Sequence, residues 1–399
     1  MCLMDTTPDI PAIQQALQEA SLDGWLFANF RGSDSIAFKV LRLPQSSSGT
    51  RRWFYFVPAR GDPQKIVHAI EPKMLDPLPG AKTVYLSWRS LHDSLLQSLE
   101  GCQRVALQYS PQNDVPTVSR VDAGTVELVR SFGVEVVSSA DLVQRFEATL
   151  DDTQLEGHRR SAGHLRRLVD EVFAEVAKDL RAGRGVSERS LLDFALRYLE
   201  ESGLLTDHAP ILAVNEHAAD PHFEVPERDS APVRAGDLLL FDVWAKESSP
   251  RSIYADITWC AFVGAEPPPK ILEVFDVVRR ARDAALDRCD EAFRSGSPLR
   301  GFEVDRAARD VIEKAGYGDR YLHRTGHSIH EETHGNGANM DDLETHDTRL
   351  IIPRTLFSVE PGIYLSGDFG IRSEVDVFHA GNQAEVTGGR QDELVRIVP

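Results

Sequence analysis

LLLFDVWA (238–245) and YADITWCAFVG (254–264) each place one aspartate inside a run of strand-forming residues. The apolar, β-branched and aromatic content of both runs predicts two strands joined by a short connection. A carboxylate inside a half-buried strand costs several kcal/mol unless it is paired or bound to a cation. Asp242 and Asp256 are therefore the first residues that the sequence marks for chemistry.

Two further strand-like runs repeat this pattern. Glu360 stands in LFSVEPGIYL (356–365) and Glu374 stands in IRSEVDVFHA (371–380). Arg372, two residues before Glu374, can neutralise one carboxylate, but it cannot satisfy four. The set therefore predicts a pair of divalent cations, and oxygen-rich ligands with one imidazole suit manganese, cobalt or zinc.

The segment LHRTGHSIHEETHG (322–335) supplies the imidazole, since it holds histidines at 323, 327, 330 and 334. Within it, HEETH (330–334) matches the HExxH pattern, which binds zinc through two histidines when it lies on a helix. Gly326 and Gly335 flank that stretch, and no apolar stripe of helical period supports it. Met340 stands where the extended motif has a third histidine. The HExxH interpretation is therefore disfavoured.

The order of the elements predicts two domains. Strand-like and helix-like segments alternate over about the first 145 residues, which is typical of an α/β layer domain. A helical stretch over 139–180 follows and marks the natural place to divide the chain. After it, hairpin-like strand pairs and long helices predict an α+β domain. We therefore expect one domain at 1–148 and a second at 149–399.

The charge balance limits the partners. Lys and Arg total 44 against 62 Asp and Glu, a formal net charge of −18, which repels phosphate backbones and anionic membranes. No apolar run approaches the roughly 18 residues that cross a bilayer, and the start of the chain lacks the regions of an export signal. We expect a soluble, cytoplasmic protein that binds neither nucleic acid nor membrane. The cysteines at 2, 102, 260 and 289 have no paired spacing and predict unpaired thiols.

Five residues in this order, Asp242, Asp256, His327, Glu360 and Glu374, together with the strings HRTGHSIH, VEPGIY and IRSE, resemble the pita-bread metallopeptidases. The resemblance lies with the branch of creatinases, prolidases and Xaa-Pro aminopeptidases, and it covers the whole chain. It implies a creatinase-like N-terminal domain, a pita-bread catalytic domain and a homodimer.

The same resemblance implies a role for each motif residue. The five residues would bind two metal ions, with Asp256 and Glu374 bridging them. Glu360 would also carry protons, while His222 (in DPHFEV) and His334 would contact the substrate. The remaining two catalytic candidates support the site: Arg372 shares a strand face with Glu374, and Tyr364 matches the tyrosine of the EPGxY motif.

The implied activity is hydrolysis of Xaa-Pro dipeptides by a metal-bridging hydroxide, on a small peptide with proline at its second position. The N-terminal domain argues against a methionine aminopeptidase, and the intact ligand set argues against a creatinase. An Xaa-Pro aminopeptidase acting on longer peptides stays open as an alternative. So does a catalytically silent binding protein on the same fold.

The sequence offers two sources for a residue that binds the substrate carboxylate. Where prolidases of this family place an arginine, the chain has His346, with Arg349 three residues later. A basic residue from the N-terminal domain of a partner subunit could replace it; the candidates are Arg31, Arg42, Arg51 and Arg52.

Other positions depart from the family pattern. The connection between Asp242 and Asp256 is longer than usual, and we expect the extra residues at its solvent-facing tip. Trp244 stands at a usual glycine position and could bind substrate, while Ser328 and His330 should narrow a glycine-lined wall, with His330 entering the pocket. The histidines expected to be capping or solvated are His208, His217 and His323.

Overall fold

The computed structural model describes residues 8–399. The chain divides into two compact units, Met1–Glu147 and Ala148–Pro399. Each unit has hydrophobic clusters of its own. None of the helices in the part of the chain that the structure describes has the length and apolar character needed to cross a membrane.

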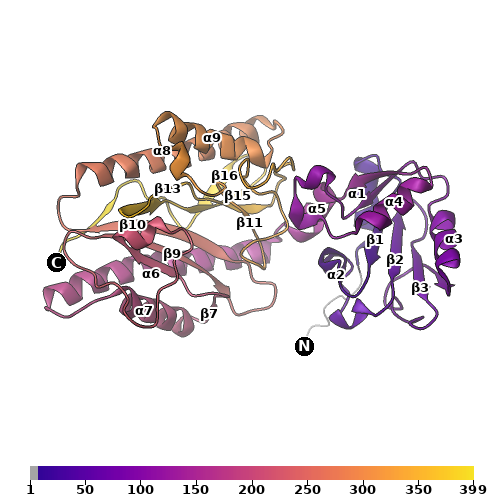
Figure 1. The fold of residues 1–399 in the computed structure, drawn as a ribbon, viewed down its shortest axis with the longest axis horizontal. Helices are drawn as coiled ribbons and strands as arrows, with labels where there is room; N and C mark the ends of the chain where they lie inside the picture. The colour runs from indigo at the N-terminus through magenta and orange to yellow at the C-terminus, as the bar shows by residue number, and fades with distance from the viewer. Residues whose placement is uncertain (1–7) are drawn as a thin grey trace. The chain divides into compact units, whose positions relative to one another are not determined.

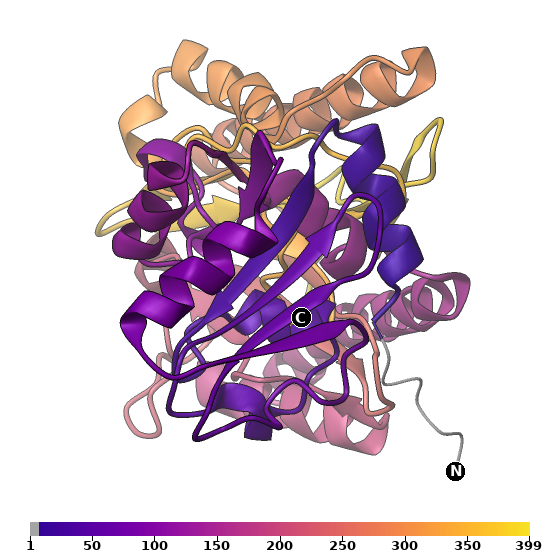
Figure 2. The same cartoon turned by 90° about the vertical axis from the view of Figure 1, so that its right-hand side faces the viewer.

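The N-terminal unit is built on one six-stranded sheet with strand order β4-β3-β2-β1-β5-β6 (Figures 1 and 2). The strands are β1 Gly24–Asn29, β2 Trp53–Pro58, β3 Gln64–His68, β4 Ala81–Tyr85, β5 Arg104–Leu107 and β6 Glu135–Ser138. The helices are α1 Ile10–Glu19, α2 Ser35–Val40, α3 Trp88–Ser98, α4 Ala123–Ser131 and α5 Ala140–Glu147, with short 3-10 turns at Gln45–Ser48, Pro111–Asn113 and Pro116–Val118.

Strand alternation explains why this unit has three layers. Neighbouring side chains on a strand point to opposite faces, so Phe27 packs in the cluster that contains α1, α2 and α5. Leu26 packs in the cluster with α3 and α4. The α/β class is confirmed, but the sheet is mixed: β1 pairs with β2 and β2 with β3 in antiparallel register, whereas the other three strand pairs are parallel.

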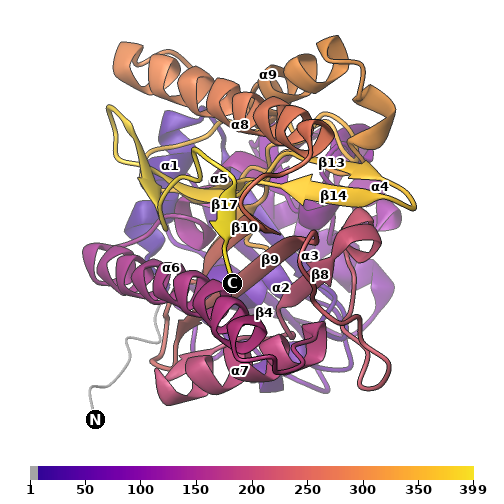
Figure 3. The same cartoon turned by 90° about the vertical axis from the view of Figure 1, so that its left-hand side faces the viewer.

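The C-terminal unit places strands between two helical layers, with α6 and α7 on one side and α8 and α9 on the other (Figures 1 and 3). The helices are α6 Asp152–Arg181, α7 Glu188–Glu201, α8 Pro269–Ser295 and α9 Gly301–Lys314, with 3-10 turns at Asn215–Ala219 and Gly318–Arg320. The strands are β7 Leu204–Leu205, β8 Ile211–Val214, β9 Leu238–Glu247, β10 Ala255–Val263, β11 Ser328–Ile329, β12 Leu356–Val359, β13 Gly362–Leu365, β14 Phe369–Arg372, β15 Val375–His379, β16 Ala384–Thr387 and β17 Val395–Ile397.

These strands form three sheets. One has the order β17-β10-β9-β7, with β8 also paired to β9; the second has the order β11-β12-β15-β16; β13 and β14 form a separate pair. All pairs in this unit are antiparallel except β10 with β17. The expected α+β class with hairpin-like pairs is confirmed.

Three expected elements are interrupted, each for a local reason. The helical stretch 139–180 is two helices, because Asp151 caps the start of α6 by accepting a hydrogen bond from the Gln154 amide at 2.8 Å. The run 356–365 breaks between β12 and β13 at Pro361, which has no amide hydrogen to donate. The run 371–380 breaks between β14 and β15 at Ser373 and Glu374.

The three cysteines within the described residues are unpaired, as expected; Cys102 is half-buried, and Cys260 and Cys289 are buried. Cys2 lies outside the described residues.

Candidate metal centre

The β9–β10 hairpin turns two aspartates toward the interior. Phe241 and Val243 point into the cluster under α6 and α7, so Asp242 between them points to the opposite face. Thr258 pairs directly with Asp242 in the antiparallel register, and Asp256 lies two residues earlier on the same face. Both aspartates are buried, at 7% and 5% exposure.

The longer connection of this hairpin keeps both aspartates in register. Ser248, Ser249, Pro250 and Arg251 are exposed. The end of β9 beyond Asp242 is paired to β10 and β7. The extra residues therefore lie at the solvent-facing tip, as expected.

Gly326 allows His327 to approach β12. A β-carbon at position 326 would lie 1.9 Å from the carbonyl oxygen of Ser358, so only glycine permits this contact. The two segments then bond, because the His327 amide donates to Ser358 Oγ at 3.0 Å. The imidazole comes to rest with Nε2 3.7 Å from Asp256 Oδ2 and 3.4 Å from Glu360 Oε1.

The two glutamates stand where strands break and are held by neighbouring hydroxyls. Ser358 Oγ donates to Glu360 Oε1 at 3.1 Å, and Thr258 Oγ1 donates to Glu374 Oε2 at 2.7 Å. The Glu374 amide also donates to the Thr258 carbonyl at 3.2 Å. Residues far apart in the sequence therefore place five donor groups in one buried region.

The electrostatics of this region require compensation. Burial raises the pKa of Asp256 well above its usual value, and repulsion from Glu374 and Asp242 adds to the effect. Burial, with repulsion from Glu360 and Asp242, raises the pKa of Glu374 well above its usual value. Burial also raises the pKa of Glu360 to about 7. Like charges crowded in a low-dielectric site resist ionisation together. Bound cations would remove this penalty.

The donor set fits divalent cations. Asp256, His327 and Glu374 each offer one atom, and these atoms all lie within 4.8 Å of one another. Oδ1 of Asp242 and Oδ1 of Asp256 are buried without a hydrogen-bond partner among the described residues. Burial holds the pKa of His327 well below its usual value, so its ring is neutral, the form that binds metals.

Arg372 connects these carboxylates to a supporting network. Its Nη2 donates to Asp242 Oδ2, its Nε donates to Thr258 Oγ1 at 3.0 Å, and its Nη1 donates to the Tyr364 hydroxyl at 3.0 Å. The Tyr364 hydroxyl lies 2.6 Å from His323 Nε2. Arg372 and Tyr364 therefore lie where the sequence predicted support for the site.

His323 corrects an expectation, because it is not solvated. Its ring is enclosed against Tyr364, and burial together with the positive charge of Arg372 lowers its pKa to about 3. The carbonyl of Arg324, 2.7 Å from Nδ1, can only accept, so Nδ1 carries the hydrogen and Nε2 accepts from Tyr364. His323 lies four residues before His327 with Gly326 between them, and no hydrophobic periodicity in this segment indicates that its ring is enclosed.

A cavity of about 1000 Å³ lies over these groups. All five predicted metal ligands line it: Asp242, Asp256, His327, Glu360 and Glu374. The cavity is also lined by Arg372, His222, His334, Trp244 and the exposed His208. Tyr364 does not line it. The His334 ring lies 4.2 Å from the His327 ring, measured between centroids.

The loop that carries His222 is held by a buried glutamate at the start of α7. Glu188 Oε1 accepts from the Val214 amide at 2.9 Å and lies 2.8 Å from His217 Nδ1. Glu188 Oε2 accepts from the Ala231 amide at 2.9 Å. His217 also stacks on Phe223, with ring centroids 4.5 Å apart. His217 is therefore a structural residue of this loop, and neither a cap nor a freely solvated side chain.

Two expectations about the cavity wall are wrong. Among the described residues that line the cavity, neither Ser328 nor His330 is present. Ser328 Oγ is turned to the Gly337 amide, which donates to it at 3.0 Å. The HEETH stretch containing His330 forms bends and no helix, which confirms that the HExxH interpretation does not apply.

The expected position of a carboxylate anchor is also outside the cavity. His346 packs on Phe302 and bonds Asp342 at 2.7 Å. Arg349 is buried in an ion pair with Asp347 at 2.5 Å. Neither lines the cavity within the described chain. Sequence reasoning missed several charged residues that do, among them Asp207, Arg324 and Glu344. These three stand in polar segments without hydrophobic periodicity, a pattern that is typical of solvated loops.

Comparison with known proteins gives a consistent assignment. Residues 161–379 match the model of metallopeptidase family M24. The probable dipeptidase PepE of Mycobacterium tuberculosis is 30% identical over 276 residues, which is 68% of this chain and 66% of that protein, just under two thirds of its length. The Xaa-Pro dipeptidase of Lactobacillus delbrueckii subsp. lactis is 31% identical over 193 residues, 48% of each chain.

Solved structures share the fold along nearly the whole chain. Dipeptidase PepE from Mycobacterium ulcerans has a TM-score of 0.68 at 21% identity and covers 98% of this chain and 97% of its own. The prolidase from Thermococcus sibiricus has a TM-score of 0.62 at 20% identity, with 98% and 99% covered. The architecture is therefore that of the two-domain pita-bread proteins. With the family model matching more than half of its length, the chain belongs to metallopeptidase family M24.

Proposed function

We propose that this protein is an Xaa-Pro dipeptidase that uses two divalent metal ions, manganese, cobalt or zinc. The observation that carries the proposal is the convergence of four carboxylates and one neutral imidazole on the wall of a single cavity. Family membership supports a peptidase. Relatives named dipeptidase and Xaa-Pro dipeptidase support the substrate class. A homodimer is part of the proposal.

The metal ions would be held by Asp242, Asp256, His327, Glu360 and Glu374. Once bound, two such ions lower the pKa of a water molecule and polarise the carbonyl under attack. Asp256 and Glu374 would supply carboxylate ligands near the centre of the site, since their ligand atoms and that of His327 lie within 4.8 Å of one another.

The chain's own residues would then position the substrate and move protons. Glu360 faces the cavity with its side chain 15% exposed, and one of its oxygens already accepts from Ser358. It is the candidate that takes up a proton and returns it to the leaving amine. His334 and His222 line the same cavity and would orient the carbonyl of the scissile bond. Arg372 would keep Asp242 in place through its bond to that carboxylate.

The apolar side chains that line the cavity are suited to binding the ring of a proline residue in the substrate. The apolar side chains of Trp244, Phe223, Leu192 and Ile211 also line the cavity, and Trp244 pairs directly with Asp256 across the β9–β10 hairpin. Trp244 is fixed by its Nε1, which donates to Asp207 Oδ1 at 2.7 Å. A rigid aromatic wall of this kind favours a compact apolar side chain.

An Xaa-Pro aminopeptidase is the second candidate. The cavity of about 1000 Å³ is larger than a dipeptide requires. The X-Pro aminopeptidase from Thermotoga maritima also shares the fold, with a TM-score of 0.55 at 20% identity over 96% of this chain and 100% of its own.

The deciding experiment compares hydrolysis of Ala-Pro with hydrolysis of Ala-Pro-Ala by the purified, metal-loaded chain. We expect the dipeptide to be preferred, and we expect a chelator to abolish its turnover. Preference for the tripeptide would assign the aminopeptidase activity. Absence of both turnover and bound metal would assign the silent binding protein.

A further inference from the structure

Three arginines among the described residues line the cavity, and two of them are already occupied. Arg372 contacts Tyr364, Thr258 and Asp242. Arg189 forms an ion pair along α7 with Asp193 at 2.8 Å and is 38% exposed. The third is Arg324, whose side chain is 20% exposed.

The guanidinium of Arg324 retains unused donors. The ion pair that the structure gives it within the described residues is with Glu344, at 4.0 Å between Nη1 and Oε2. That separation is longer than a direct hydrogen bond. A guanidinium has five N–H donors in a planar fork that matches a carboxylate. Arg324 can therefore accept a second anion from the cavity while Glu344 remains beside it.

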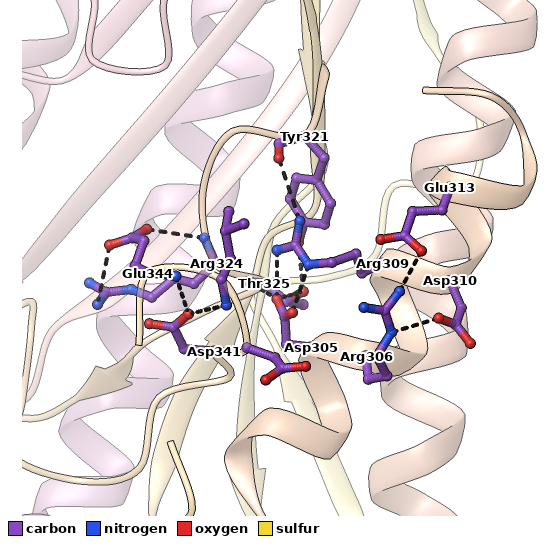
Figure 4. Close-up of polar contacts among 12 residues, drawn as sticks. Asp305, Arg306, Arg309, Asp310, Glu313, Tyr321, Arg324, Thr325, Asp341 and Glu344 are labelled. Atoms are coloured by element: carbon purple, nitrogen blue, oxygen red, sulfur yellow. Dashed lines mark hydrogen bonds and ion pairs between the residues drawn. The ribbon is translucent and has the colours of Figure 1, made fainter. Parts of the chain in front are cut away.

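The backbone around Arg324 is held rigidly by α9, as Figure 4 shows. Asp305 Oδ1 accepts from the Thr325 amide at 2.9 Å and from its hydroxyl at 2.7 Å. Arg309 donates to the carbonyl of His323 at 3.0 Å and forms an ion pair with Asp305 at 2.8 Å. The residues on both sides of Arg324 are thus fixed to one helix.

A second set of bonds fixes the Glu344 side of the pair (Figure 4). The Arg324 amide donates to Glu344 Oε1 at 3.1 Å. Asp341 in turn accepts from the Glu344 amide at 2.9 Å and from the Thr345 amide at 3.1 Å. These bonds hold the Arg324 backbone and the Glu344 carboxylate in place, and Arg324 lines the cavity.

Arg324 shares its cavity with the candidate reactive groups. His327, His334 and Glu360 line the same cavity as Arg324. An anion bound by Arg324 would therefore lie in the cavity that holds the groups that act on the peptide bond.

We propose that Arg324 binds the C-terminal carboxylate of the dipeptide substrate, and that Glu344 is the counter-ion that positions its guanidinium. The inference rests on the proposed Xaa-Pro dipeptidase function and deepens it. In a dipeptide the terminal carboxylate follows the scissile bond after a single residue, so a fixed cation near the reactive groups selects dipeptides. A longer peptide would place an uncharged amide at the same point.

The test compares Ala-Pro with Ala-Pro-amide, which lacks the terminal charge, on the metal-loaded full chain. A charge-assisted contact of this kind corresponds to about 10- to 100-fold in affinity. We expect Arg324→Met to raise KM for Ala-Pro by about that factor and to leave KM for the amide within about 3-fold, with kcat little changed. Arg324→Lys should keep part of the preference for Ala-Pro over Ala-Pro-amide. Arg189→Met removes one positive charge from another place in the cavity lining and should leave that preference unchanged.

Binding of proline and prolinamide, measured by calorimetry, gives the same comparison without turnover. Two results would overturn the assignment of Arg324 while leaving the dipeptidase proposal intact. Arg324→Met could weaken binding of Ala-Pro and Ala-Pro-amide equally, or it could leave the preference for the charged ligand over the amide unchanged. Failure of the unsubstituted enzyme to hydrolyse Ala-Pro would instead overturn the proposed function, and the inference with it.

Discussion

The hydroxyl of Thr258 donates a hydrogen bond to Glu374 across 2.7 Å, joining β10 to the break between β14 and β15. The same oxygen accepts from Arg372 Nε at 3.0 Å. One buried side chain therefore fixes both a candidate metal ligand and the arginine that supports the site.

Thr258→Val should weaken metal binding. The substitution preserves shape but leaves Glu374 without this donor and Arg372 Nε without this acceptor. Loss of such a supporting contact lowers metal affinity by about 10- to 100-fold. Thr258→Ser keeps the hydroxyl and is the matched control. Metal titration by calorimetry measures both, and equal affinities for the valine and serine variants would contradict the role given to the hydroxyl.

The effect of Asp256→Asn on the free energy of unfolding should differ in sign between the metal-free and the metal-bound protein. Burial and neighbouring carboxylates raise the pKa of Asp256 in the folded protein, so its ionisation at pH 8 opposes folding when no cation is present. The metal-free variant should therefore be more stable than the metal-free parent at pH 8. With metal added, the parent should gain about 3 kcal/mol at 100 times its Kd, and the variant should gain little.

Urea unfolding with and without chelator measures this reversal. Asp170→Asn, at an exposed position on α6, controls for the removal of one negative charge. If the metal-free Asp256→Asn protein were less stable than its parent at pH 8, the repulsion assigned to the cluster would be wrong.

Tyr364→Phe should impair the site without disturbing the packing of the ring. The hydroxyl lies between His323 Nε2, at 2.6 Å, and Arg372 Nη1, at 3.0 Å. Removing it takes the hydroxyl partner from His323 Nε2 and leaves Arg372 Nη1 with its 3.3 Å bond to the Pro221 carbonyl, at a cost of about 1–3 kcal/mol. We expect lower kcat and lower thermal stability. Tyr317→Phe, whose hydroxyl bonds the exposed Glu273 side chain, should match the parent in both measurements.

His158 should make stability depend on pH under acidic conditions. Its ring is fully buried on α6, bonded to the Tyr254 carbonyl at 2.8 Å and to Thr387 Oγ1 at 2.7 Å, and burial lowers its pKa to about 4. The unfolded chain binds this proton near pH 6.5. The stabilisation is therefore complete above pH 6.5 and is lost as the pH falls toward 4, by up to about 3 kcal/mol.

The measurement compares urea unfolding of the metal-free parent and His158→Gln between pH 4.5 and 7. The variant cannot titrate at this position, so its deficit relative to the parent should shrink as the pH falls. His208→Gln removes an exposed imidazole as the control. A deficit that stays constant across this range would show that His158 is not the titrating group.

The sequence predicted the strands of the site better than their ends. Asp242 and Asp256 were recognisable because a carboxylate in an apolar strand is costly, and strand alternation already gave the face on which they lie. The breaks at Pro361 and Glu374 were not recognised, because their flanking residues keep the apolar content of a continuous strand. Which residues bind metal stays a prediction, although the structure brings all five candidates to one cavity.

The residues that sequence reasoning missed share one property. His323 and Arg324 stand in a polar, glycine-containing segment, which indicates a loop but gives no direction to its side chains. Their orientation depends on Asp305 and Arg309 of α9, which bond the backbone of this segment. No pattern within residues 321–327 contains that information.

The sequence by itself determined the element types, the acidic strands and the exclusion of a zinc helix at HEETH, because periodicity, turn residues and the cost of buried charge are local properties. Only the tertiary structure decided which groups meet. Thr258 and Glu374 are 116 residues apart, and Arg372 reaches Asp242 across 130. Contacts over such separations arise when sheets and helices pack. The cavity, its lining by Arg324 and the position of His346 outside it therefore follow from tertiary packing rather than from any one segment.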